Sequence, residues 1–263
     1  MTSPVLAGLD PRGVATVALN RPQVGNAYDG AMIQGLLTAM DELCAKPGLR
    51  ALLLQGNGKH FQAGADLAWV RNVSAASAQE NERISRATAE VMDRLNRLPV
   101  PTVALVQGGC FGGGTGMAAA CDVVIAADNA IFSISEVRWG LTAAIIIPQL
   151  SDAISARQLR RYALTGERFD AAEAHRIGLA HKVVPLAELT AAGEETIGRL
   201  LENGPTAMAE TKACILRSAW GGIDRATLDA LSASHAAKRR SAEAAEGLAS
   251  FAERRPAHWT RAK

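Results

Sequence analysis

The groups best suited to chemistry in this sequence are backbone N–H groups in a glycine-rich segment, residues 107–117. Three consecutive glycines, Gly112 to Gly114, lie there between an apolar run and a short run of small residues. Because glycine has no Cβ, its backbone can approach a ligand closely, and at a helix start its N–H groups donate to an anion or a carbonyl oxygen. The segment therefore predicts a backbone binding site.

Other known uses of a glycine-rich segment fit less well. A phosphate-binding loop of the Walker A type needs a lysine after the glycines, and none follows. A dinucleotide fingerprint starting at Gly112 needs glycine at position 117, where Met117 stands, and no acidic residue ends a strand about 20 residues later. Close packing of small residues explains 118–120 but not three glycines, and on pattern alone this alternative stays open.

A second small-residue turn, residues 56–67, supports the binding interpretation. It also follows an apolar run and leads into a predicted helix, with Asp66 placed as its N-cap. Two such turns at the ends of two strands can direct two N–H donors at one carbonyl oxygen. The pair therefore predicts an oxyanion hole, a site that stabilises negative charge on that oxygen.

The elements that must position these turns follow from hydrophobic periodicity. The pattern predicts a β-hairpin formed by Val5–Leu9 and Val14–Leu19. It also predicts two long helices, Gly30–Cys44 and 78–98, and three buried strands, 52–54, Thr102–Val106 and 123–126. Alternation of strand and helix predicts right-handed crossovers and a largely parallel sheet over residues 1 to 140. The fold class is therefore α/β.

The remainder of the chain is predicted to be almost entirely helical after Pro148. Periodic stretches cover residues 186–201, 205–220, 228–237 and 243–251, with Gly178, Gly204 and Pro205 as breaks. The helices after Pro205 are amphipathic and rich in alanine, so their apolar faces need a partner surface. Another subunit and the sheet of the same chain are equally good candidates.

Composition limits the function classes. The 263 residues are 48% hydrophobic and 21% charged, and a net charge of +2 gives no general field for nucleic acid or a membrane surface. No apolar run approaches the roughly 20 residues of a membrane helix. The first residues lack the pattern of a secretion signal, so we expect a cytoplasmic protein. Four cysteines without C-x-x-C spacing predict reduced thiols and no zinc site.

Several motifs together resemble the crotonase (enoyl-CoA hydratase/isomerase) superfamily in order and spacing. They are Leu19-Asn20-Arg21-Pro22 with Asn26-Ala27, residues 58–67, Gly112 to Gly114 with Cys121-Asp122, residues 163–167, Ala172, and Gly178-Leu179. The resemblance covers essentially the whole chain. It implies a crotonase (ClpP-like) fold, with repeated ββα units forming a spiral core over residues 1–200. Residues 201–263 would form a C-terminal helical region for oligomerisation, into a homotrimer or homohexamer.

The resemblance also assigns roles to individual residues. It makes Ala65 and Gly113 the N–H donors of the oxyanion hole. Acyl-CoA would be bound by Lys59, Ala63, Gly64, Asp66, Leu67, Ala68 and Gly112, with Trp259 and Lys263 covering CoA from the same or a neighbouring subunit. CoA arrives as part of the substrate, so the resemblance implies no metal and no further cofactor.

Crotonase-type hydratases usually carry two glutamates beside the reacting double bond. Glu136 stands at the second position, whereas the first is Gly116, which cannot transfer a proton. We therefore expect Glu136 to activate water and return the proton, if burial raises its pKa. The alternative is an ordinary helix-start carboxylate near Ser133 or Ser135.

Two further polar residues near these motifs are expected to have lesser roles. His60 is expected to pack or to form a hydrogen bond in its turn, because a lone histidine is a weak signal. Arg138 is either a surface charge or a partner for an acidic group of the substrate.

Gly116 together with residues 135–141 resembles the branch that hydrates 3-substituted glutaconyl-CoA thioesters in leucine or acyclic terpenoid breakdown. Those substrates are 3-methylglutaconyl-CoA and isohexenylglutaconyl-CoA. Residues 142–148 are unusually apolar, which favours the longer isohexenyl chain. Isomerisation of a 3-enoyl-CoA is an alternative, as is a non-catalytic homologue that binds acyl-CoA or RNA. Near-neutral charge disfavours RNA, and the two glycine turns favour catalysis.

Overall fold

The computed structural model of the chain describes residues 3–220 and 225–255. Its centre is a six-stranded sheet in the order β1-β2-β3-β4-β6-β9. These strands are Val5–Leu9, Val14–Leu19, Ala51–Gly56, Thr102–Val106, Val123–Ala127 and Lys182–Val184. The first pair is antiparallel and every later pair is parallel. A three-stranded sheet, β5-β7-β8, stands beside it, formed by Gly109–Phe111, Ile131–Ser133 and Arg168–Asp170.

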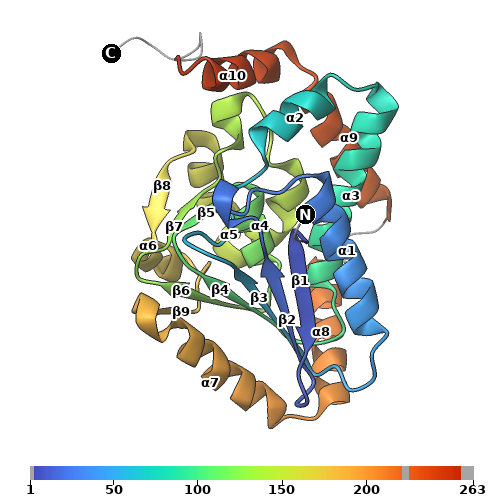
Figure 1. Cartoon of the computed structure of the whole chain (residues 1–263), viewed down its shortest axis with the longest axis vertical. Helices are drawn as coiled ribbons and strands as arrows, with labels where there is room; N and C mark the ends of the chain where they lie inside the picture. Colours follow the sequence, from blue (N-terminus) through green and yellow to red (C-terminus); the bar gives the residue numbers. More distant parts are fainter. Residues whose placement is uncertain (1–2, 221–224, 256–263) are drawn as a thin grey trace.

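Helices cover both faces of the large sheet, with α1 and α3 on one side and α7 on the other (Figure 1). The helices α1 to α10 are Gly30–Cys44, Leu67–Ser74, Ala78–Asn96, Gly113–Ala119, Ile147–Thr165, Ala171–Arg176, Leu189–Leu201, Pro205–Trp220, Arg225–Arg239 and Ala242–Ala252. Short 3-10 helices span Pro22–Val24, Glu136–Trp139, Ala144–Ile146 and Leu186–Glu188. None of the helices in the described part of the chain is long and apolar enough to cross a membrane.

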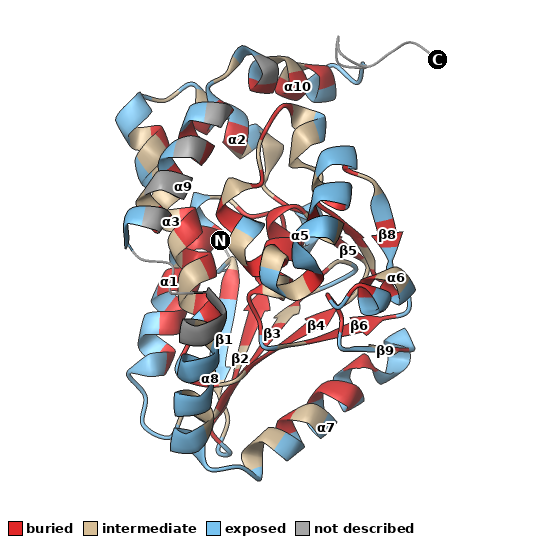
Figure 2. Ribbon diagram, turned by 180° about the vertical axis from the view of Figure 1, so that it is seen from behind, coloured by how far each residue is buried: buried red, intermediate tan, exposed pale blue. Residues whose placement is uncertain are grey.

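Apolar side chains that alternate along the strands form two separate cores, one on each face of the large sheet. In β3, Leu52 and Leu54 pack against α1 and α3, whereas Ala51 and Leu53 pack against α7. Successive side chains of a strand point to opposite faces, so a strand covered on both sides is apolar throughout. Figure 2 accordingly shows the inner strands of the large sheet as buried, whereas much of β1 is exposed.

Local signals set the ends of several elements. Asp10 closes the predicted hairpin by accepting from the backbone N–H groups of Arg12 and Val14, at 2.8 and 3.0 Å. Asp29 caps α1 by accepting from Met32 N at 2.9 Å. The predicted bounds of β1, β2, α1 and β4 are therefore confirmed.

The expectation that the chain is almost wholly helical after Pro148 is wrong at two places, and two further strands, β5 and β7, were not predicted. Strands β8 and β9 lie in that region, and β5 forms part of the first glycine segment. Each has three residues, which is too short for a periodic signal. Their strand conformation comes from their partners, since β9 pairs with β6 and both β5 and β8 pair with β7.

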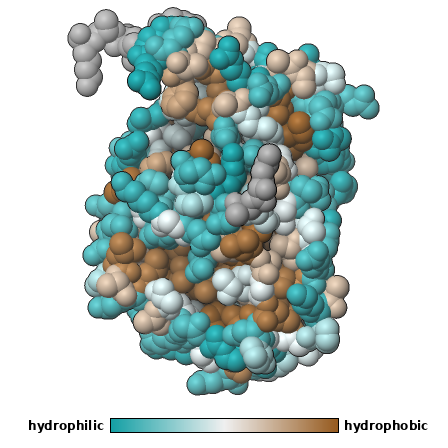
Figure 3. Space-filling view, viewed as in Figure 1, coloured by the Kyte–Doolittle hydropathy of each residue, from teal (hydrophilic) through white to brown (hydrophobic). Residues whose placement is uncertain are grey.

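The C-terminal helices α9 and α10 pack on the same chain. Asn81 of α3 donates to the carbonyl of Ala236 in α9 at 3.2 Å. Phe251 of α10 meets Trp139 edge to face, with ring centroids 4.9 Å apart. In the space-filling view, apolar side chains gather mainly over the lower half, where the sheet and α7 lie, and the surface around α10 is mostly hydrophilic (Figure 3). Assembly into trimers or hexamers stays a prediction.

Candidate active site

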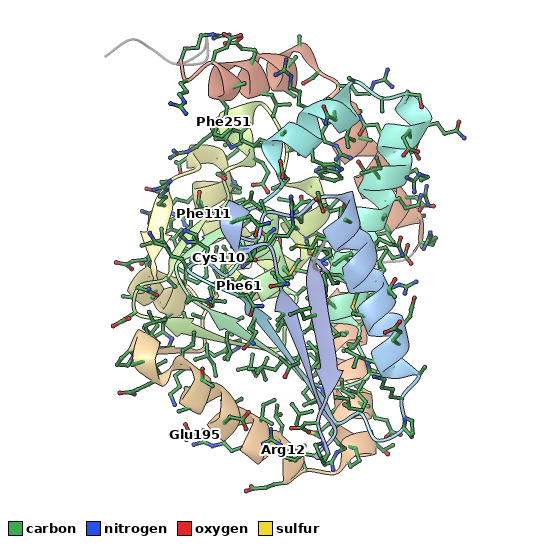
Figure 4. The ribbon with its side chains drawn as sticks, viewed as in Figure 1. Arg12, Phe61, Cys110, Phe111, Glu195 and Phe251 are labelled. Atoms are coloured by element: carbon green, nitrogen blue, oxygen red, sulfur yellow. The ribbon has the colours of Figure 1, made fainter. Side chains whose placement is uncertain are left out.

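The two small-residue turns are joined by backbone hydrogen bonds. Gln62 N donates to Gly109 O at 3.1 Å, and Phe111 N donates to Gln62 O at 2.9 Å. This short parallel bridge links the turn after β3 to strand β5. Phe61 and Cys110, both fully buried, lie close together near the centre of the molecule (Figure 4). The turns are thus held in one rigid unit.

The side chain of Gln62 fixes both turns. It is fully buried, its Oε1 accepts from Gly64 N at 2.8 Å, and its Nε2 donates to Gly64 O at 2.8 Å. A Cβ on Gly114 would lie 2.4 Å from Gln62 Oε1. Glycine at position 114 is therefore required by close approach, a reason that the sequence alone did not reveal.

The first motif braces the second turn from the other side. Asn26 is fully buried, and its Nδ2 donates to the carbonyls of Asn57 and His60 at 2.9 and 2.8 Å. Arg21 donates to the carbonyl of Ala27 at 2.6 Å. His60 Nδ1 accepts from the backbone N–H of Gly109 at 2.8 Å, which agrees with its expected structural role.

The N–H groups of Ala65 and Gly113 are both without an acceptor among the described residues. Backbone bonds from Tyr28 N to Gly64 O and from Asp66 N to Tyr28 O, both 2.9 Å, use the groups on either side of Ala65. Ala65 and Gly113 line the same cavity of about 470 Å³. Two backbone N–H groups without acceptors, on residues that line one cavity, are consistent with the predicted oxyanion hole.

Most of the predicted binding residues line this cavity. Asp66 caps α2 by accepting from Ala68 N at 3.1 Å and Trp69 N at 3.3 Å, so its predicted N-cap role is confirmed. Lys59 is exposed and does not belong to the cavity lining. Trp259 and Lys263 lie outside the described residues. The residues that do line it are Ala63, Gly64, Ala65, Asp66, Leu67, Ala68, Gly112, Gly113 and Glu136.

Glu136 enters the cavity from the first turn of the 3-10 helix Glu136–Trp139. A Cβ on Gly112 would lie 2.9 Å from its Oε1, and its buried Oε2 has no hydrogen-bond partner. Burial raises the pKa of this carboxyl from 4.5 to about 7. Its carboxylate does not cap the helix start, and the hydroxyl of Ser133 donates instead to Gly166 O at 3.1 Å.

Where the family resemblance places a first glutamate, this chain has Gly116, and a hydrocarbon side chain occupies the space beside it. A Cβ on Gly116 would lie only 2.1 Å from Cγ2 of Ile146, which is 1% exposed. No acidic side chain fits at position 116 unless Ile146 moves. Of the apolar segment 142–148, Ala143, Ile145 and Ile146 line the cavity, and Leu141 before it does so as well.

The polar cavity residues that were not predicted from the sequence include Tyr28, His235 and Arg239. A Cβ on Gly113 would lie 2.6 Å from the ring of Tyr28, so this ring stands beside the oxyanion turn. Burial lowers the pKa of His235 to about 3 and that of Arg239 to about 10. The available signal was their spacing of four residues in an alanine-rich helix, which places both on one face.

The described residues contain no cluster of three or more His, Cys, Asp or Glu side chains that could hold a metal ion. The cavity itself contains a titratable carboxyl, Glu136, and two backbone N–H groups without acceptors, which are groups suited to proton transfer and to stabilisation of a carbonyl oxygen.

The chain is similar to proteins of known sequence and structure. A family model described as enoyl-CoA hydratase/isomerase matches residues 10–262. A crystal structure of an enoyl-CoA hydratase from Shewanella pealeana is 38% identical, covers 97% of this chain and 96% of its own, and gives a TM-score of 0.79. A hydroxycinnamoyl-CoA hydratase-lyase of Pseudomonas fluorescens is 34% identical over 76% of this chain and 74% of its own length. A crotonyl-CoA hydratase of Syntrophomonas wolfei is 32% identical over 94% of each.

Proposed function

Because the chain belongs to the enoyl-CoA hydratase/isomerase family, we propose that its cavity adds water to the α,β double bond of a 3-substituted glutaconyl-CoA thioester. Membership confirms the predicted crotonase-type α/β fold and the enzyme class, an enoyl-CoA hydratase, which is a carbon–oxygen lyase. The single observation that supports the chemistry is the buried Oε2 of Glu136, which has no hydrogen-bond partner, on a carboxyl that lies against the turn that carries Gly113.

The reaction follows from the positions of three groups. The thioester oxygen accepts hydrogen bonds from Ala65 N–H and Gly113 N–H, which withdraws electrons from the double bond. The carboxylate of Glu136 removes a proton from water while the water oxygen bonds to C3, and the displaced electron pair moves to the thioester oxygen as an enolate. Glu136 then returns this proton to C2, and the enolate collapses to the thioester.

This sequence adds one hydrogen to C2 and one hydroxyl to C3 from the face of the substrate that Glu136 occupies, so addition is syn. Each oxyanion-hole donor is typically worth about 10²–10³ in rate. A positioned general acid–base group contributes about 10²–10⁴. A carboxyl with a pKa near 7 suits both halves of the reaction, because it is ionised often enough to act as a base and acidic enough to return the proton.

The cavity wall supports a substrate with a hydrocarbon branch at C3. Leu141, Ile145 and Ile146 form an apolar surface there, and Ile146 occupies the space next to Gly116. Apolar surface favours a longer hydrocarbon substituent by about 0.8 kcal/mol for each buried CH₂ group. We therefore expect a higher kcat/KM with isohexenylglutaconyl-CoA than with 3-methylglutaconyl-CoA.

A second candidate reaction is isomerisation of a 3-enoyl-CoA, which the single carboxylate favours. Glu136 alone could remove a proton from C2 and deliver it to C4, and the space beside Gly116 holds no second acid. This reaction uses the same enolate and the same two N–H donors. It differs in that no oxygen enters the product.

Turnover in ¹⁸O-labelled water separates the two reactions. The enzyme would be supplied with 3-methylglutaconyl-CoA, isohexenylglutaconyl-CoA, crotonyl-CoA and a 3-enoyl-CoA, and the products would be analysed by mass spectrometry. We expect one labelled oxygen in each product of the branched glutaconyl thioesters. Unlabelled product from the 3-enoyl-CoA alone would assign isomerisation, and turnover of crotonyl-CoA alone would overturn the proposed substrate class.

A further inference from the structure

We propose that Arg239 binds a free carboxylate at the far end of the acyl chain, so that the substrate is the CoA thioester of an unsaturated dicarboxylic acid. This inference rests on the proposed hydration of an enoyl-CoA. It assigns the residue that selects a glutaconyl-type substrate over one that ends in a hydrocarbon or an amide.

Arg239 is a buried cation without a counter-ion. It is 2% exposed at the end of α9 and lines the cavity that contains Glu136. Its Nη2 donates to the carbonyl of Asn81 at 3.2 Å and to the hydroxyl of Ser85, whereas its buried Nε has no acceptor. No carboxylate of the described residues forms an ion pair with it. Burying an unpaired charge costs several kcal/mol, so its presence in a cavity calls for a ligand.

The other arginines of the cavity differ from Arg239 in their exposure. Among the described lining residues, Arg138 and Arg168 are both exposed to solvent. The guanidinium of Arg168 also lies over the ring of Phe111, 5.3 Å from its centroid. Water hydrates these two cations, and an ion pair at an exposed site is worth little. The buried Arg239 is therefore better suited than Arg138 to the acidic substrate group.

Ser85 links Arg239 to a second donor. The Ser85 oxygen accepts from Arg239, and the same oxygen lies 3.3 Å from Nδ1 of His235. Burial lowers the pKa of His235 to about 3 and keeps the ring neutral. Arg239 and His235 thus meet at one hydroxyl oxygen from adjacent turns of α9, one as a cation and the other as a neutral ring.

Arg239, Glu136 and Tyr28 line the same cavity of about 470 Å³. Burial is the main cause that raises the pKa of the Tyr28 hydroxyl; the negative charge of Glu136 raises it further, and the positive charge of Arg239 lowers it. Tyr28 itself stands beside Gly113. In a five-carbon dicarboxylic chain the second carboxylate is only two bonds from C3, so the cation that binds it must line the same cavity as Glu136, as Arg239 does. A guanidinium binds a carboxylate through two parallel hydrogen bonds, which gives direction as well as charge.

The experiment compares two thioesters that differ only at the far end, 3-methylglutaconyl-CoA and its distal primary amide. Arg239→Met is compared with Arg240→Gln, a matched control one residue beyond the end of the same helix, because Arg240 is exposed and outside the cavity lining. We expect Arg239→Met to lower kcat/KM by about 10- to 100-fold for the acid, as for loss of hydrogen bonds to a charged group. For the amide, kcat/KM should change by less than threefold, and Arg240→Gln should change neither.

The outcomes separate this inference from the proposed function. If the wild-type protein hydrates neither thioester, the proposed function fails. If it hydrates both equally well, or if Arg239→Met lowers both equally, Arg239 does not select the carboxylate, although hydration stands.

Arg239→Lys is the second variant, for the case in which the methionine variant does not fold. It keeps the charge and removes the two-pronged geometry, so it should lose part of the activity on the acid alone. An equal loss on the amide would overturn the assignment.

Discussion

Replacing Glu136 by glutamine tests the active site most directly, because the amide keeps the size of the side chain and removes its titratable proton. Hydration should fall by about 10²–10⁴-fold, the usual contribution of general acid–base catalysis. Binding of the thioester should persist, since the N–H groups of Ala65 and Gly113 are unchanged. Turnover close to that of the wild type would refute the assignment of Glu136 as the proton-transfer group.

The same change should stabilise the protein at high pH. Burial raises the pKa of Glu136 from 4.5 to about 7. Each unit corresponds to 1.36 kcal/mol, so ionised Glu136 lowers the free energy of unfolding by about 3 kcal/mol. Below pH 4.5 the group is protonated in the folded and unfolded states, and it does not lower the free energy of unfolding. As the pH rises from 4.5 to 7 the unfolded chain releases its proton first, and stability declines.

Denaturant unfolding at pH 4.5 and pH 8.5 measures this effect. The Glu136→Gln variant should match the wild type at pH 4.5 and exceed it by up to about 3 kcal/mol at pH 8.5. Glu42→Gln is the matched control, because Glu42 is exposed in α1 and should show no difference at either pH. Equal stability of wild type and Glu136→Gln at both pH values would show that the carboxyl is hydrated and not buried.

Three further predictions concern the surroundings of Glu136. Gly116→Glu should destabilise the protein by about 1–3 kcal/mol through overpacking against Ile146, and adding Ile146→Ala should recover part of this loss in denaturant unfolding. Gln62→Leu leaves the N–H and carbonyl of Gly64 without partners, so it should lower the free energy of unfolding by about 2–4 kcal/mol. In steady-state kinetics it should lower kcat more than it raises KM. A pH series should show kcat/KM rising through about pH 7 as Glu136 ionises and then reaching a plateau.

Each of these has a result that would contradict it. Ile146→Ala alone is the control for position 116, and a Gly116→Glu single variant as stable as the wild type would show that the space is open. For Gln62→Leu, an unchanged kcat in a destabilised protein would show that Gln62 stabilises the fold and does not affect the geometry of the turn. For the pH series, a midpoint below pH 5 would mean that the base is not the buried carboxyl.

The elements that could be predicted from the sequence are those whose signals are local. The hairpin of β1 and β2 and the helix α1 carry their own periodicity and their own turn and cap residues, Asp10 and Asp29. The three-residue strands β5, β8 and β9 carry no such signal. They become strands because a neighbour supplies hydrogen-bond partners, and that neighbour is not adjacent in sequence.

The same distinction holds for the site. The two turns and Glu136 lie in continuous motifs, so the sequence indicated them together, although their catalytic roles stay predictions. His235 and Arg239 reach the cavity only because α9 packs on α3, and Ser85 is 150 residues from His235. Nothing within α9 shows which partner its polar face will meet. The reason for glycine at positions 114 and 116 was hidden in the same way, since Gln62 and Ile146 are distant in sequence.

Beside Gly116, the hydrocarbon side chain of Ile146 occupies the volume that a second carboxyl would need. A neighbouring carboxylate would raise the pKa of Glu136 by repulsion. No charged group contributes to the shift that Glu136 shows, and burial is its first cause. The catalytic pKa therefore depends on how completely the cavity walls exclude water from Oε2. We therefore expect apolar lining residues such as Ile146 to affect the pKa of Glu136 as well as recognition of the acyl chain.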